Sequence, residues 1–128
     1  MLTIGLTNLS TAVVTDSLTA RAMGSGDLDV LATPAMIAGM ENVCMNCVKE
    51  HLEEGQTTVG TRISVSHISA TPVGDTVTYT CALNDIDGRS LRFVVCAFDS
   101  AGKIGEGVHE RFIVNSDRFM EKAKSKLK

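Results

Sequence analysis

The feature that most constrains the fold is a single long helix, which the sequence predicts from Pro34 to about Leu52. Thr33 is a good N-cap residue, and Pro34 suits the first helical position. Gly55 follows a charged stretch and predicts the end of the helix. The apolar residues recur at the spacing of one helix face, at Met36, Ile37, Met40, Val43, Cys44, Cys47 and Val48. Such a stripe predicts a helix packed on a flat surface.

After this helix the hydrophobic period changes to that of strands. Alternation predicts strands from residue 57 to about 67, and at 77–83, 91–98 and 104–114, with a further strand within 2–14. Residues 15–29 predict a short helix and a loop that could cover a pocket. In the strand after the helix, Val59, Ile63, Val65 and His67 should share one face. Short turns force antiparallel neighbours, so the prediction is an α+β fold with one sheet of about five strands wrapped around one helix.

Length and composition place the chain among single-domain proteins. Its 128 residues predict one domain, 1–128, with a basic C-terminal tail at 118–128. The net charge of −3 and the scarcity of aromatic residues exclude nucleic acid as the expected partner. We expect no membrane segment, because no run of about 18 apolar residues exists. One helix cannot cover such a sheet and its edges, which predicts a homodimer.

Glu41 is the first candidate for a catalytic residue. It is the only charged residue between Pro34 and Val48, and it lies at the border of the apolar stripe. A carboxylate that is partly withdrawn from water is a better base near neutral pH. The alternative is a boundary residue that reaches water or pairs with a basic group.

His67 and Thr33 are the other candidates. Alternation turns His67 toward the helix layer, where it could hydrogen-bond a carboxylate, although a structural histidine would also fit. The hydroxyl of Thr33 lies at the positive end of the helix, where capping alone would explain it. Eight helical residues separate Thr33 and Glu41 by about 12 Å, so a substrate, a water or a second subunit would have to join them.

The remaining cysteines and cations indicate no further site. Cys44 and Cys47 show a spacing known from metal sites, but both fall in the core stripe, and we expect no metal and no cofactor. All four cysteines are expected to be thiols in a reducing cytoplasm. His109 is expected to be an ordinary sheet residue. Arg62, Arg89 and Arg92 are open alternatives for a phosphate contact.

Several motifs in order resemble one known family. These are residues 32–36 (Ala-Thr-Pro-Ala-Met), Glu41, residues 54–62, residues 67–74 (His-Ile-Ser-Ala-Thr-Pro-Val-Gly) and residues 105–112. Together they resemble the fluoroacetyl-CoA thioesterase-like branch of the hotdog-fold thioesterases, from about Gly24 to Phe119. In that family a threonine, a glutamate and a histidine form the catalytic set. The matching residues here are Thr33, Glu41 and His67.

The resemblance implies a hotdog homodimer that hydrolyses a short or small acyl-CoA to the free acid and CoA. A family glycine near the thioester carbonyl matches Gly60, whose backbone N–H would bind the carbonyl oxygen. Glu41 would either attack the carbonyl or activate a water. His67 would orient Glu41 and protonate the thiolate. Two rival functions remain, a hotdog hydratase or dehydratase and a non-catalytic acyl-CoA-binding module.

Overall fold

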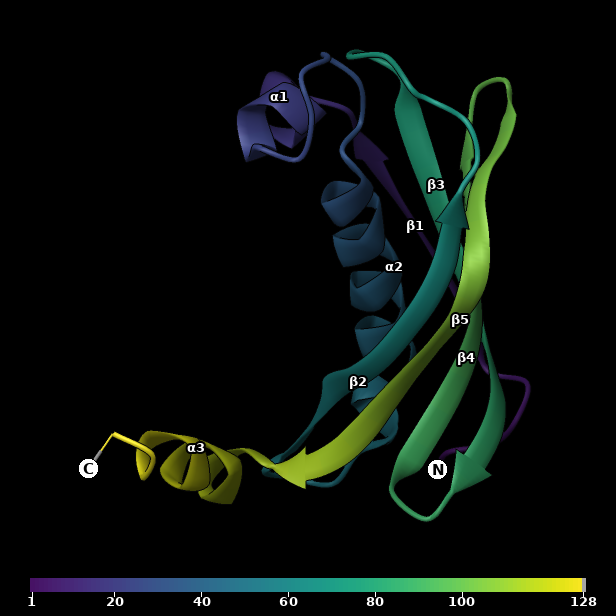
Figure 1. The fold of residues 1–128 in the computed structure, drawn as a ribbon. Helices are drawn as coiled ribbons and strands as arrows, with labels where there is room; N and C mark the ends of the chain where they lie inside the picture. Colours follow the sequence, from purple (N-terminus) through teal and green to yellow (C-terminus); the bar gives the residue numbers. More distant parts are fainter. Residues whose placement is uncertain (128) are drawn as a thin grey trace.

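One antiparallel sheet of five strands curves around one central helix (Figure 1). The structure is a computed structural model and describes residues 1–127. The strand order is β1-β3-β4-β5-β2. The elements are β1 (Thr7–Val13), η1 (Asp16–Leu18), α1 (Ala20–Met23), α2 (Thr33–Val48), η2 (Lys49–His51), β2 (Gln56–His67), β3 (Thr76–Asp87), β4 (Ser90–Asp99), β5 (Gly102–Asn115) and α3 (Ser116–Lys124). This arrangement confirms the predicted α+β fold, and no helix within residues 1–127 is long and apolar enough to cross a membrane.

The start of α2 differs from the prediction in one respect that matters for the site. Ala32 is the N-cap residue, and it makes no side-chain capping hydrogen bond. Thr33 is the first helical residue, so the prediction that it caps the helix is wrong. The helix can begin without a side-chain cap because Pro34 has a preset φ and no N–H that needs a partner. The Thr33 hydroxyl is therefore available for another contact.

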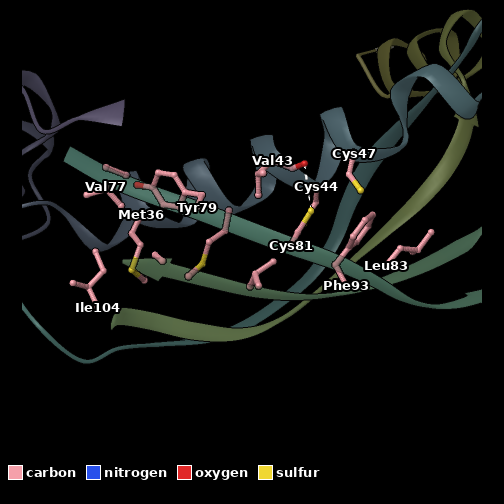
Figure 2. Close-up of a cluster of buried hydrophobic side chains, with 14 of the residues drawn as sticks. Met36, Val43, Cys44, Cys47, Val77, Tyr79, Cys81, Leu83, Phe93 and Ile104 are labelled. Atoms are coloured by element: carbon pink, nitrogen blue, oxygen red, sulfur yellow. Dashed lines mark hydrogen bonds between the residues drawn. The ribbon is translucent and has the colours of Figure 1, made fainter. Parts of the chain in front are cut away.

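The predicted apolar stripe of α2 forms the core against the sheet (Figure 2). Large side chains meet glycines across this interface. A Cβ built at Gly39 would overlap the ring of Tyr79, and one built at Gly105 would lie 2.6 Å from the sulfur of Met36. Because these two glycines have no side chain, the helix and the sheet can approach closely. The buried stripe consists of Met36, Met40, Val43, Cys44, Cys47 and Val48, while Ile37 is half-buried.

Three thiols lie together inside this core (Figure 2). Cys81 on β3 donates a hydrogen bond to the carbonyl oxygen of Val43, 3.5 Å away. A hydrogen bond with Cys81, together with burial, raises the pKa of Cys44, and burial raises the pKa of Cys47 to about 12. All four cysteines of the chain are free. The predicted packing role of Cys44 and Cys47 is confirmed by their burial.

A bulge in β2 changes which residues face the helix. The register between β2 and β5 shifts between Gly60 and Arg62, so Thr61 is an extra residue. Before the bulge, Val59 pairs with the exposed Phe112; after it, Ile63 pairs with the buried His109. The prediction that Val59 shares a face with Ile63 is therefore wrong. Because of the bulge, both Gly60 and His67 lie on the helix side of the sheet.

Candidate active site

The hydroxyl oxygen of Thr33 lies 2.7 Å from Nδ1 of His67. Thr33 occupies the first turn of α2, and His67 is the last residue of β2, so the curvature of the sheet around the helix joins them. Both line a cavity of about 290 Å³, which we call the Thr33–His67 pocket. Its other lining residues are Ala20, Ser25, Val30, Leu31, Ile68, Ser69 and Ala70.

A lid segment, residues 16–30, forms one wall of this pocket. It contains η1 and α1 and the loop that returns to α2, and it lies beyond the N-terminal end of α2 (Figure 1). Two isolated bridges anchor it, between Thr19 and Leu31 and between Val30 and Pro72. Arg21 and Asp29 close the loop with an exposed ion pair of 3.2 Å. The predicted short helix and loop are therefore present, and this segment does cover a pocket.

His67 has one ring nitrogen without a protein partner. Nδ1 faces Thr33, whereas Nε2 is buried and has no hydrogen-bond partner among residues 1–127. A buried polar atom without a partner is costly, so it marks a place where another group can bind. Burial lowers the pKa of His67, against the opposing effect of a backbone hydrogen bond at Ser69. The imidazole is thus neutral near pH 7 and able to accept or relay a proton.

Glu41 and Gly60 meet in a second cavity, which we call the Glu41 pocket. A Cβ built at Gly60 would lie 2.9 Å from Oε2 of Glu41 and 3.2 Å from Cε1 of His109. Only a glycine leaves room for the carboxylate to lie directly against the strand. The cavity measures about 430 Å³ and is lined by Ala38, Glu41, Asn42, Met45, Thr58, Val59, Gly60 and Arg111.

A buried guanidinium lies beside this carboxylate. Arg111 on β5 is 6% exposed, and it donates through Nε and Nη2 to the hydroxyl and carbonyl oxygens of Thr58, at 2.7 and 2.9 Å. Its Nη1 donates to Nε2 of His109, 3.1 Å away. Among residues 1–127 no carboxylate lies within ion-pair distance of Arg111. Burial lowers the pKa of Arg111, and the charge of Glu41 opposes that shift.

His109 connects the guanidinium to the backbone of the bulged strand. Its Nδ1 donates to the carbonyl oxygen of Arg62 at 2.8 Å, which leaves Nε2 as the acceptor from Arg111. Sequence reasoning took His109 for an ordinary sheet residue and did not consider Arg111. Both lie on the helix side of β5 at alternate positions. The pattern of two ionisable residues on the buried face of a strand could have identified them.

The structure does not join the two halves within one chain. Thr33 and His67 line one pocket and Glu41 and Gly60 the other, and within residues 1–127 no hydrogen bond or ion pair links Glu41 to His67. Both halves border β2, which is one of the two outer strands of the sheet and has one unpaired edge. The two half-sites are therefore arranged along an edge that another strand can extend.

Comparison with known proteins shows close relatives. The family model described as fluoroacetyl-CoA-specific thioesterase matches residues 14–117. The fluoroacetyl-CoA thioesterase of Streptantibioticus cattleyicolor is 40% identical over 98 residues, which are 77% of this chain and 70% of that protein. A solved structure of the fluoroacetyl-CoA thioesterase FlK superposes with a TM-score of 0.93 at 33% identity, covering 98% of both chains. A hot-dog-like protein from Thermanaerovibrio acidaminovorans shares the fold, with a TM-score of 0.89 at 22% identity over 98% of this chain and 93% of that one.

Proposed function

Because this chain belongs to the fluoroacetyl-CoA-specific thioesterase family, and is thus a hotdog acyl-CoA thioesterase, we propose that it hydrolyses short acyl-CoA thioesters at a site built by two protomers. The observation that carries this proposal is the separation of the candidate residues into two half-sites along one open strand edge. Each half contains a group that the other lacks. One supplies a hydroxyl and an imidazole, the other a carboxylate and a glycine.

Antiparallel pairing of β2 with the same strand of a second copy would join these halves. Gly60 and His67 are seven residues apart on β2. A two-fold axis midway between them would place Gly60 of one protomer opposite the partner's His67. Glu41 of the first protomer lies against Gly60, so it would then face the partner's Thr33 and His67. The dimer would hold two such sites.

The chemistry follows from these positions. The thioester carbonyl would lie beside Gly60, whose N–H would donate to the carbonyl oxygen; one such donor is worth about 10²–10³ in rate. In the water route, Glu41 takes a proton as water adds to the carbonyl carbon. Glu41 passes that proton to the partner's His67, and the C–S bond then breaks as the protonated imidazole donates it to the sulfur. In the covalent route, Glu41 itself attacks the carbonyl carbon, and the C–S bond breaks so that CoA leaves as the thiolate. Water then hydrolyses the acyl-enzyme anhydride to the free acid and the Glu41 carboxylate.

The remaining groups position the reactants. Thr33 would hold the imidazole through its hydroxyl, which also lies at the positive end of α2. The buried Arg111 would place a positive charge beside Glu41 without forming a direct ion pair.

The substrate is proposed to be a short acyl group on CoA. A mutant of FlK has been solved in complex with fluoroacetate and CoA, and it superposes on this chain with a TM-score of 0.88 at 34% identity, covering 92% of this chain and 99% of that one. The Thr33–His67 pocket, at about 290 Å³, lies at the small end of ligand pockets, which supports a small acyl group. Among residues 1–127 no Phe, Tyr or Trp side chain lines it, so halogenated, branched and plain acyl groups all belong in the test.

Release of free thiol from a panel of short, branched, aromatic and halogenated acyl-CoAs tests the proposal. Wild-type protein should release CoA from at least one short acyl-CoA, and Glu41→Gln should lower that rate about 10³-fold while the dimer persists. Thr61→Ala, at the exposed bulge residue, is the matched control. Double-bond chemistry without thiol release would favour a hydratase. Thermal stabilisation by acyl-CoA without turnover would favour a binding module.

A further inference from the structure

The C-terminal helix α3 packs against almost nothing in its own chain. It projects from the end of β5 beyond the sheet, at the opposite end of the molecule from the lid segment (Figure 1). None of its residues is buried. Its start is nevertheless well defined, because the Asn115 side chain accepts from the N–H of Arg118 at 3.0 Å and the N–H of Ser116 donates to the Gly55 carbonyl at 2.9 Å. The apolar side chains of this capped helix are therefore available for a contact outside the chain.

An apolar groove lies between α3 and the outer face of β5. Phe112 is 41% exposed and Phe119 is 43% exposed, although both are aromatic side chains. Cations border the groove. The lining residues are Phe112, Val114, Phe119, Lys122, Ala123 and Lys126.

We propose that this groove receives Ile68 of a second copy of the chain, so that each α3 clamps the end of the partner's β2 that carries the catalytic imidazole. The inference rests on the β2-paired dimer proposed above. The occupant follows from the register. If Gly60 lies opposite the partner's His67, then Val59 lies opposite the partner's Ile68, and Val59 is the direct β5 neighbour of Phe112.

The orientation of Ile68 fits this groove. It continues β2 beside β5, since its N–H donates to the Ile104 carbonyl at 2.7 Å. Ile68 directly follows the last residue of β2 and borders the Thr33–His67 pocket; continued alternation would turn its side chain to the face opposite His67, which is the outer face where Val59 and Phe112 lie. Ile68 is 56% exposed in the single chain. An exposed isoleucine and an exposed aromatic groove are thus complementary across the proposed axis.

The charges around the two surfaces are also complementary. The lid segment beside Ile68 carries three carboxylates (Asp16, Asp27 and Asp29) and one guanidinium (Arg21), a net charge of −2. The described part of the chain from Ser116 to Leu127 has four cations and two carboxylates, a net charge of +2. The two-fold axis brings the C-terminal end of β2 in one protomer next to the N-terminal end of β2 in the other. The acidic lid segment of one protomer therefore faces the basic α3 of the other. Opposite charges there favour this pairing over a shifted one.

A double-mutant cycle on dimerisation tests the contact. Ile68→Ala and Phe119→Ala should each raise the monomer–dimer dissociation constant about tenfold, as expected for truncation of a packed apolar contact in an interface. The double variant should be little weaker than either single one, because both remove the same contact. Leu9→Ala is the control, since Leu9 is equally exposed but lies on β1 at the other edge of the sheet. Sedimentation equilibrium measures the constant.

A chain that ends after Ser116 provides the second test. Circular dichroism should show the sheet intact, the dissociation constant should rise at least tenfold, and hydrogen exchange in residues 64–70 should become faster. If the wild type is a dimer and all these variants keep its dissociation constant and its hydrogen exchange, the α3 contact alone is overturned. A strictly monomeric wild type would overturn the contact and the shared site together. A dimer with the expected variant effects but no thiol release would overturn the proposed function and leave the contact standing.

Discussion

Thr33 and His67 lie within hydrogen-bonding distance, 2.7 Å between Oγ1 and Nδ1, although 34 residues separate them in the chain. The contact joins the first turn of α2 to the last residue of β2, one of the two outer strands of the sheet. It leaves Nε2 of His67 buried without a partner among residues 1–127. A histidine held on one side and free on the other is suited to transfer a proton to a bound group.

Thr33→Val should lower acyl-CoA hydrolysis about tenfold, because it removes the hydroxyl that holds His67 but keeps the shape of the side chain. The free energy of unfolding should change by less than about 1 kcal/mol, since Ala32 and not Thr33 occupies the N-cap position. Thr33→Ser keeps the hydroxyl and should retain most of the activity. Steady-state kinetics and urea unfolding measure both effects. A large loss of stability in the valine variant would show that the hydroxyl mainly supports the fold.

Mixing two inactive variants should restore activity if each site takes residues from both protomers. Glu41→Gln and His67→Asn are each expected to be inactive as homodimers. After unfolding and refolding together, half of the dimers are mixed, and one of their two sites is intact, so about a quarter of wild-type activity should return. Thiol release from the refolded mixture measures this. Continued inactivity of a mixture that contains heterodimers would place all catalytic groups in one chain.

Gly60→Ala should lower activity about 10²-fold. The added methyl group would lie 2.9 Å from Oε2 of Glu41, so the carboxylate must move away from the strand. Misplacement of a catalytic group by about 1 Å is enough for a loss of this size. Thr61→Ala, one residue along on the exposed bulge, should leave the rate nearly unchanged. Equal rates in the two variants would remove Gly60 from the proposed site.

Acidification should destabilise the fold through the buried His109. Burial lowers the pKa of His109 below its ordinary value of 6.5, helped by the charge of Arg111 and opposed by the Arg62 carbonyl and by Glu41 and Glu110. The unfolded chain therefore binds more protons below pH 6.5, and the free energy of unfolding should fall as pH falls through that range and level off above it. His109→Gln should show a flatter dependence in urea unfolding at pH 5.5 and 7.5. An equally steep dependence in the variant would exclude His109 as a source.

The sequence predicted the elements well wherever one periodicity persisted. The apolar stripe of α2 and the alternation of Val77, Tyr79, Cys81 and Leu83 on β3 are local patterns, and the structure buries these residues as expected. The errors arose at single residues. An N-cap preference could not show that Ala32 would occupy that position. Alternation could not reveal the bulge at Thr61, because a bulge depends on the neighbouring strand.

By itself, the sequence determined the fold class and singled out Thr33, Glu41 and His67 as candidates, because residue type and spacing along an element are local properties, while Gly60 followed only from the resemblance to the thioesterase family. Only the tertiary structure decided which of them meet. It placed Thr33 with His67, set Glu41 against Gly60 beside the buried Arg111, and left β2 as an open edge between the two pairs. These contacts depend on how far the sheet curves around α2 and on where its register shifts. Both properties arise from packing between distant segments and have no signature in a local pattern.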